Sequence, residues 1–153
     1  MNPSAINPPR TYAEWVTVLD MLAARTNDDA VLEAMLNGTI EWQSGVAERF
    51  ARKLVDTINA RMNAATDRFQ KEMSRAGGQE SVIVRALMAL RKEMGFLAKA
   101  ISLPAIPAED RTQYRRLVLE QADKIQKSLE DSARNDRTGK LASIVRNNRV
   151  NAL

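Results

Sequence analysis

The sequence predicts an all-α fold, a helical bundle built around one long antiparallel helical hairpin. Apolar residues recur at intervals of three and four over long stretches, which is the spacing of one face of an α-helix. Aromatic residues make up only 5% of the chain while alanine and methionine are frequent, a composition that favours packed helices over sheets. No stretch of useful length alternates between polar and apolar residues. With 153 residues, the chain has the length of one domain.

The amino-terminal part predicts a short extension and then a helix. Residues 1–10 contain three prolines and are expected to form an extension. Thr11 and Glu14 have the spacing of a capping box, in which each side chain bonds the backbone amide of the other residue. This motif and the helical spacing of the apolar residues behind it predict a helix over 12–25, with an apolar stripe formed by Trp15, Val18, Leu19 and Leu22.

A second, shorter helix is predicted over 28–37. It follows Asn27, and its first turn carries two aspartates, where the helix dipole favours negative charge. Gly38 comes two residues after its last apolar residue, Leu36, and is expected to end it. The apolar face of this helix consists of Val31, Leu32, Met35 and Leu36.

Two long helices, over 45–76 and 80–102, are predicted to form the antiparallel hairpin. Neither proline nor glycine interrupts residues 46–76, and the apolar positions there are Val46, Phe50, Leu54, Ile58, Met62, Ala65, Phe69 and Met73. The glycine pair Gly77-Gly78 supplies the turn, because glycine adopts left-handed backbone at low cost. In the second helix the apolar residues alternate in steps of four and three, as in a heptad seam formed by Ile83, Leu87, Leu90, Met94, Leu97 and Ile101.

A fifth helix is predicted over 108–133, after two prolines that end the hairpin. It is expected to pack along the hairpin as the third helix of the core, with the two amino-terminal helices covering one end. Residues 11–133 are therefore interpreted as a single helical-bundle domain. Residues 134–153 are interpreted as a basic carboxy-terminal tail with one short amphipathic turn.

The complete absence of histidine and cysteine narrows the functional classes. Histidine is the usual proton shuttle near neutral pH and the commonest metal ligand, and cysteine supplies thiolate nucleophiles and zinc ligands. Catalytic triads, zinc sites and disulfides are thus excluded. Because no complete catalytic or nucleotide-binding motif remains, we expect no enzymatic activity and no cofactor.

Two partial motifs bear on enzyme chemistry. Glu120 and Asp123 lie three residues apart on one helix face, but a magnesium site of the all-α pyrophosphatase type needs a second pair, typically two glutamates three residues apart. No two glutamates in the chain have that spacing. Residues 137–140 contain Thr-Gly-Lys, yet the first glycine and the final hydroxyl of a phosphate-binding loop are missing. A magnesium-dependent enzyme built on Glu120 and Asp123 is the weakest of three hypotheses.

The basic residues form two groups that could meet an acidic partner or nucleic acid. The net charge of +4 combines an acidic amino-terminal part with a basic middle and a basic tail. One group shares a face of the first long helix, and the other lies in the tail, where it is free, docked on its own bundle or bound to a partner. The candidate contacts are Arg61, Arg68, Lys71 and Arg75 on the helix and Arg137, Lys140, Arg146 and Arg149 in the tail.

Taken together, the sequence predicts a non-enzymatic interaction or assembly protein that works through apolar helix faces and associates with itself. Trp42, in a turn-rich connection, is a candidate interface anchor, because tryptophan is enriched at binding hot spots. The alternative is an accessory or regulatory protein that binds nucleic acid through its basic groups. No apolar stretch resembles a signal peptide or spans a bilayer, so a cytoplasmic protein with no membrane insertion is expected. No small-molecule substrate can be identified from the sequence.

Overall fold

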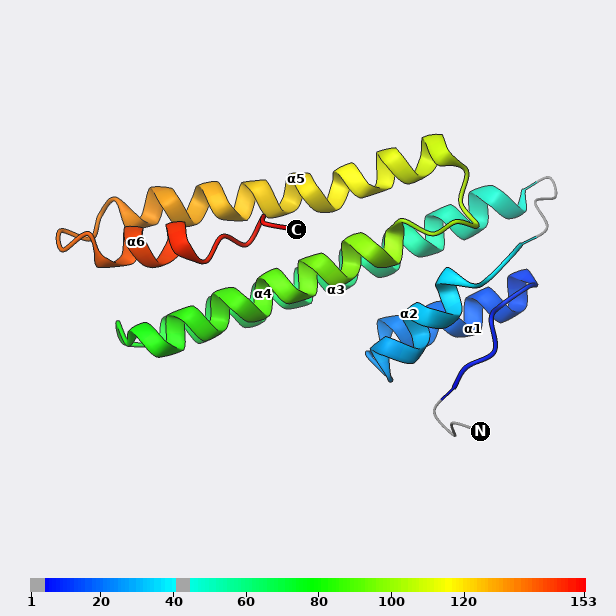
Figure 1. Ribbon diagram of the computed structural model, residues 1–153, viewed down its shortest axis with the longest axis horizontal. Helices are drawn as coiled ribbons and strands as arrows, with labels where there is room; N and C mark the ends of the chain where they lie inside the picture. Colours follow the sequence, from blue (N-terminus) through cyan, green and yellow to red (C-terminus); the bar gives the residue numbers. More distant parts are fainter. Residues whose placement is uncertain (1–4, 41–44) are drawn as a thin grey trace. The chain divides into compact units, whose positions relative to one another are not determined.

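The computed structural model describes residues 5–40 and 45–153, and in these residues the chain is all-helical, as predicted (Figure 1). No strand occurs in this described part. The helix bounds differ from the predicted ones by at most two residues. The helices are α1 (Tyr12–Ala23), α2 (Asp28–Leu36), α3 (Val46–Arg75), α4 (Glu80–Ile101), α5 (Ala108–Ala133) and α6 (Lys140–Asn147).

The start of α1 confirms the capping box, and its end is set by backbone conformation. The Thr11 hydroxyl accepts from the Glu14 amide at 3.2 Å, and the Glu14 carboxylate accepts from the Thr11 amide at 3.2 Å. After α1, Arg25 and Asn27 both have positive φ values, 58° and 53°. Left-handed backbone cannot continue a right-handed helix, so α1 ends before the predicted Arg25.

Gly77 and Gly78 form the turn between α3 and α4 as predicted, with φ values of 58° and 81°. Gly38 follows α2 as predicted, but its backbone is not left-handed. A Cβ atom there would lie 2.6 Å from Cζ2 of Trp15, so glycine is needed for space rather than for its conformation.

Contacts within the chain group the residues into two compact units that share the three longest helices. Unit 1 consists of residues 1–61 and 99–115, and unit 2 of residues 62–98 and 116–153. Unit 1 thus contains α1, α2 and the first half of α3, together with the connection from α4 to α5. Unit 2 contains the tip of the α3–α4 hairpin, most of α5, and α6.

The core of unit 1 is centred on Trp15, which is fully buried. Its indole nitrogen donates to the carbonyl of Thr39 at 2.8 Å, and its ring meets the edge of Phe50 at a centroid distance of 5.0 Å. These contacts hold α1 against α3 and against the segment after α2. Further buried apolar side chains in this unit are Leu19, Leu22, Val31, Met35, Leu54, Ile58, Leu103 and Ile106.

The core of unit 2 is the predicted heptad seam of α4, which is buried from Ile83 to Leu97. The second half of α3 contributes Met62, Ala65 and Phe69, and α5 contributes Val118 and Ala122. Ile144, Val145 and Val150, in and after α6, are also buried. The tail is therefore part of this unit. Within the described residues, no helix has both the length and the apolar content that a bilayer crossing requires.

Candidate interaction surfaces

Arg61, a predicted nucleic-acid contact, is buried and connects α1 with α2. Its side chain is only 3% exposed. The guanidinium donates to both carboxylate oxygens of Asp28, at 3.0 and 3.1 Å, and to the carbonyl of Leu22 at 3.1 Å. This forked geometry suits the planar guanidinium. The guanidinium of Arg61 is therefore buried and hydrogen-bonded within unit 1. Arg61 does not belong to an exposed basic face.

The other basic candidates are exposed. Arg68, Lys71 and Arg75 lie on the part of α3 that belongs to unit 2, and none of them makes an ion pair with a described residue. Arg137, Lys140 and Arg146 are likewise exposed and outside the ion pairs of the described chain. Arg149 differs, because it pairs with Glu130 at 3.5 Å.

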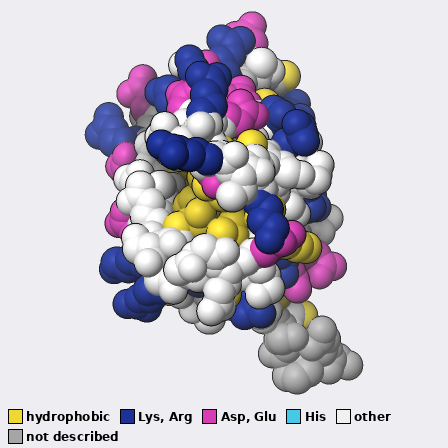
Figure 2. Space-filling view, turned by 90° about the vertical axis from the view of Figure 1, so that its left-hand side faces the viewer, with side chains coloured by type: hydrophobic (Ala, Val, Ile, Leu, Met, Phe, Trp, Pro, Cys, Tyr) yellow, Lys and Arg dark blue, Asp and Glu magenta, His cyan; other side chains and the backbone are white. Residues whose placement is uncertain are grey.

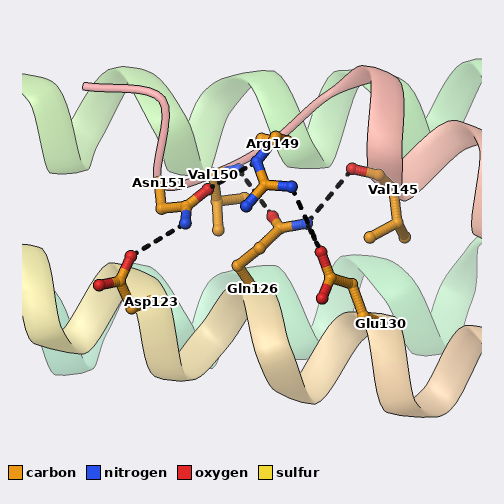
Figure 3. Close-up of polar contacts among 7 residues, drawn as sticks. All are labelled: Asp123, Gln126, Glu130, Val145, Arg149, Val150 and Asn151. Atoms are coloured by element: carbon orange, nitrogen blue, oxygen red, sulfur yellow. Dashed lines mark hydrogen bonds and ion pairs between the residues drawn. The ribbon is translucent and has the colours of Figure 1, made fainter.

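Gln126 of α5 holds the tail, at Val145 and Val150, against α5 (Figure 3). Its side chain is buried, with 2% of its surface exposed. The side-chain oxygen accepts from the Val150 amide at 3.0 Å, and the side-chain nitrogen donates to Glu130 at 3.0 Å and to the Val145 carbonyl at 3.5 Å. A buried amide side chain whose oxygen and nitrogen are both bonded fixes one register of the tail on α5.

Two exposed contacts also join the tail to α5. Asn151 donates to Asp123 at 2.9 Å, and the Arg149–Glu130 pair lies on the other side of Gln126 along α5 (Figure 3). Past them, a Cβ on Gly95 of α4 would lie 3.9 Å from Leu153, an ordinary contact distance. The residues after α6 thus return along α5 and reach Gly95, in the carboxy-terminal half of α4.

Arg61 and Gln126 are core positions that the sequence pattern did not predict. Each lies on a helical stripe of buried residues: Arg61 between Ile58 and Ala65, and Gln126 four residues after Ala122. This spacing is present in the sequence. In the sequence alone, however, a polar residue at such a position looks like a break in the apolar stripe. Only its buried hydrogen-bond partner shows that it belongs to the core.

Gln126→Ala is expected to loosen the tail. The substitution leaves the buried Val150 amide without its acceptor, which costs about 1–3 kcal/mol. Amide hydrogen exchange should accelerate across residues 144–151, and the free energy of unfolding should fall by that amount. The control is Gln113→Ala, the same change at an exposed position of α5. Unchanged exchange at Val150 in the Gln126 variant would contradict the assigned role.

Asp136 closes the loop before α6. Its carboxylate accepts from the Leu141 amide at 2.9 Å and from the hydroxyl and amide of Thr138. These bonds, together with the nearby charge of Lys140, hold the pKa of Asp136 below its ordinary value of 3.8. The carboxylate thereby takes the place of a helix cap, since Gly139 at the cap position has no side chain.

The outer face of α4 combines cations with an exposed apolar side chain. Arg85, Met88 and Lys92 lie on the side of the helix opposite the buried seam, and all three are exposed. Met88 is 50% exposed, the highest value among the exposed large apolar side chains of the described residues. Neither cation makes an ion pair with a described residue. We call these three residues the α4 face.

Unit 2 as a whole is basic. It has 14 basic and nine acidic side chains, a net charge of +5, whereas unit 1 has nine and ten, a net charge of −1. Figure 2 views the end of the molecule that contains the Gly77–Gly78 turn and the loop 134–139. Hydrophobic side chains are visible in the middle of this face, and Lys and Arg side chains stand on several sides of them (Figure 2). Apolar and cationic side chains therefore occur together on the face that Figure 2 draws.

The remaining candidates are Trp42 and the pair Glu120 and Asp123. Trp42 lies outside the described residues. Glu120 is exposed, and Asp123 accepts the hydrogen bond from Asn151. Among the described residues, no group of three or more acidic side chains is close enough to hold a metal ion. Comparison of the chain with protein-family models, with curated proteins and with solved structures identified no match.

Proposed function

We propose that this chain is a non-enzymatic interaction protein that assembles through exposed helix faces and associates with itself. The α4 face is the principal contact. The observation that supports the proposal is the half-exposed Met88 between two cations, Arg85 and Lys92, that make no ion pair in the described chain. A methionine adapts its shape to an apolar partner, and flanking cations add affinity for an acidic one. We place this assembly in the cytoplasm, which stays a prediction from composition.

Met88→Glu is expected to weaken self-association at least tenfold, which corresponds to about 1.4 kcal/mol. The reason is that a carboxylate would have to be buried at the centre of the contact. Sedimentation velocity across a concentration series measures the effect. Gln70→Glu is the matched control, because it adds the same charge at an exposed position of α3 in unit 2. Equal association constants for the two variants would remove the α4 face from the contact.

Nucleic-acid binding is the second candidate function, favoured by the exposed row Arg68, Lys71 and Arg75 on α3. When a row of cations neutralises phosphates, the logarithm of the binding constant falls linearly with the logarithm of salt concentration. Replacing all three with glutamine should reduce that slope by up to about 2.7 in duplex DNA, at about 0.9 for each phosphate that is no longer neutralised. A duplex titration at several salt concentrations measures the slope. Deleting residues 134–153 is a poor test, because the deletion also removes buried Val145 and Val150.

A further inference from the structure

The outward face of α2 is the opposite in charge of the α4 face. Asp29, Glu33 and Leu36 are exposed and share one side of α2 by their spacing of four and three residues. Leu36 is 40% exposed. Neither carboxylate makes an ion pair with a described residue. We call these three residues the α2 face.

A groove lies beside the α2 face, and the local structure explains it. The Thr39 amide donates to the Pro9 carbonyl at 2.9 Å, which holds the extended segment before α1 next to the end of α2. Between them is a groove of about 450 Å³. Its apolar lining includes Ile6, Pro8, Ala30 and Ala34, and among the described lining residues the charged ones are Asp29 and Glu33. The lining of the groove therefore combines small apolar side chains with two acidic ones.

The two faces are complementary in charge. The carboxylates of Asp29 and Glu33 are four residues apart, about 6 Å along the helix, and the cations of Arg85 and Lys92 are seven residues apart, about 10.5 Å. Each face carries two like charges and one large apolar side chain. Because arginine and lysine side chains are long and flexible, both cations can reach the two carboxylates when the faces are laid against each other, with Met88 facing the apolar side chains that line the groove.

We propose that the α2 face and groove of one copy of this chain receive the α4 face of a second copy. This contact rests on the proposed function and names the partner surface for it. Because the two faces lie on different elements, the contact joins unlike faces, head to tail, and each copy carries one of each. Two copies either bury both pairs of faces in a closed dimer, or leave one of each free, in which case association continues into chains or a ring.

Charge reversal on one face at a time provides the test. One variant is Asp29→Lys with Glu33→Lys, and the other is Arg85→Glu with Lys92→Glu. In sedimentation velocity at low salt, each variant alone is expected to lose most of its self-association, to a mass near 17.1 kDa. An equimolar mixture is expected to associate again, because the unaltered α4 face of the first variant fits the unaltered α2 face of the second, and the two reversed faces also complement each other in charge. A chain with both faces reversed should associate again.

The control reverses two exposed acids of α3, Asp67→Lys with Glu72→Lys, and should associate as the unaltered chain does. Circular dichroism verifies that each variant is folded. If a reversed variant is unfolded, the neutral pair Asp29→Asn with Glu33→Gln replaces it, with at least tenfold weaker association expected.

The outcomes separate this contact from the proposed function. A monomeric unaltered chain at every concentration rejects both. Self-association that survives reversal of either face rejects the head-to-tail contact and leaves the proposed function standing. Two monomeric variants that form no complex on mixing also reject the contact, and point to another partner for the α4 face.

Discussion

Arg61→Ala is expected to lower the free energy of unfolding by about 3 kcal/mol, near the lower end of the range for breaking a buried ion pair. The substitution leaves the Asp28 carboxylate and the Leu22 carbonyl without the guanidinium that they share. Asp28 is 29% exposed, so water recovers part of the loss. Urea denaturation followed by circular dichroism measures the change.

Arg68→Ala is the matched control, since it removes the same side chain from an exposed position of the same helix. Its effect should stay within about 0.5 kcal/mol. A double-mutant cycle with Asp28→Ala isolates the interaction between Arg61 and Asp28. The coupling free energy should account for more than half of the loss of stability caused by Arg61→Ala. Equal stabilities for the Arg61 and Arg68 variants would show that the buried fork is not formed.

Trp15→Ala is expected to cost about 3–5 kcal/mol, the usual range for removing a large buried aromatic side chain. Trp15 is fully buried, and its loss would remove both the packing against Phe50 and the hydrogen bond to Thr39. The same loss should free the segment after α2, so amide exchange at Thr39 should accelerate. Thermal and urea unfolding give the magnitude.

Gly38 provides a sharper version of this test. Gly38→Ala places a Cβ atom against the Trp15 ring and should destabilise the chain by about 1–3 kcal/mol, as overpacking does. Trp15→Phe removes Cζ2, the ring atom nearest to that Cβ. The Gly38→Ala effect should therefore be smaller in the Trp15→Phe background. Additive effects would contradict the close packing of these two residues.

The helices could be predicted from the sequence because their signals are local. The capping box at Thr11, the glycine pair at Gly77-Gly78 and the heptad seam of α4 each act within a few residues along the chain. The early end of α1 could not be predicted in this way, since Arg25 is no usual choice for left-handed backbone.

The candidate site was predicted less well, because charge alone does not reveal burial. Arg61 and Arg68 are seven residues apart and look equivalent in sequence, yet one is buried beside Asp28 and the other is exposed. The partner of Arg61 lies 33 residues earlier in the chain, and such a pairing leaves no local pattern. The α4 face was not predicted for a related reason, since the apolar periodicity of this helix marks only the seam on its opposite side.

Sedimentation equilibrium of the unaltered chain, over a wide range of concentrations and at low and high salt, tests the central claim most directly. Assembly through charged helix faces predicts an average mass above 17.1 kDa that rises with concentration and falls as salt is added. A mass that stays at the single-chain value under every condition would contradict it.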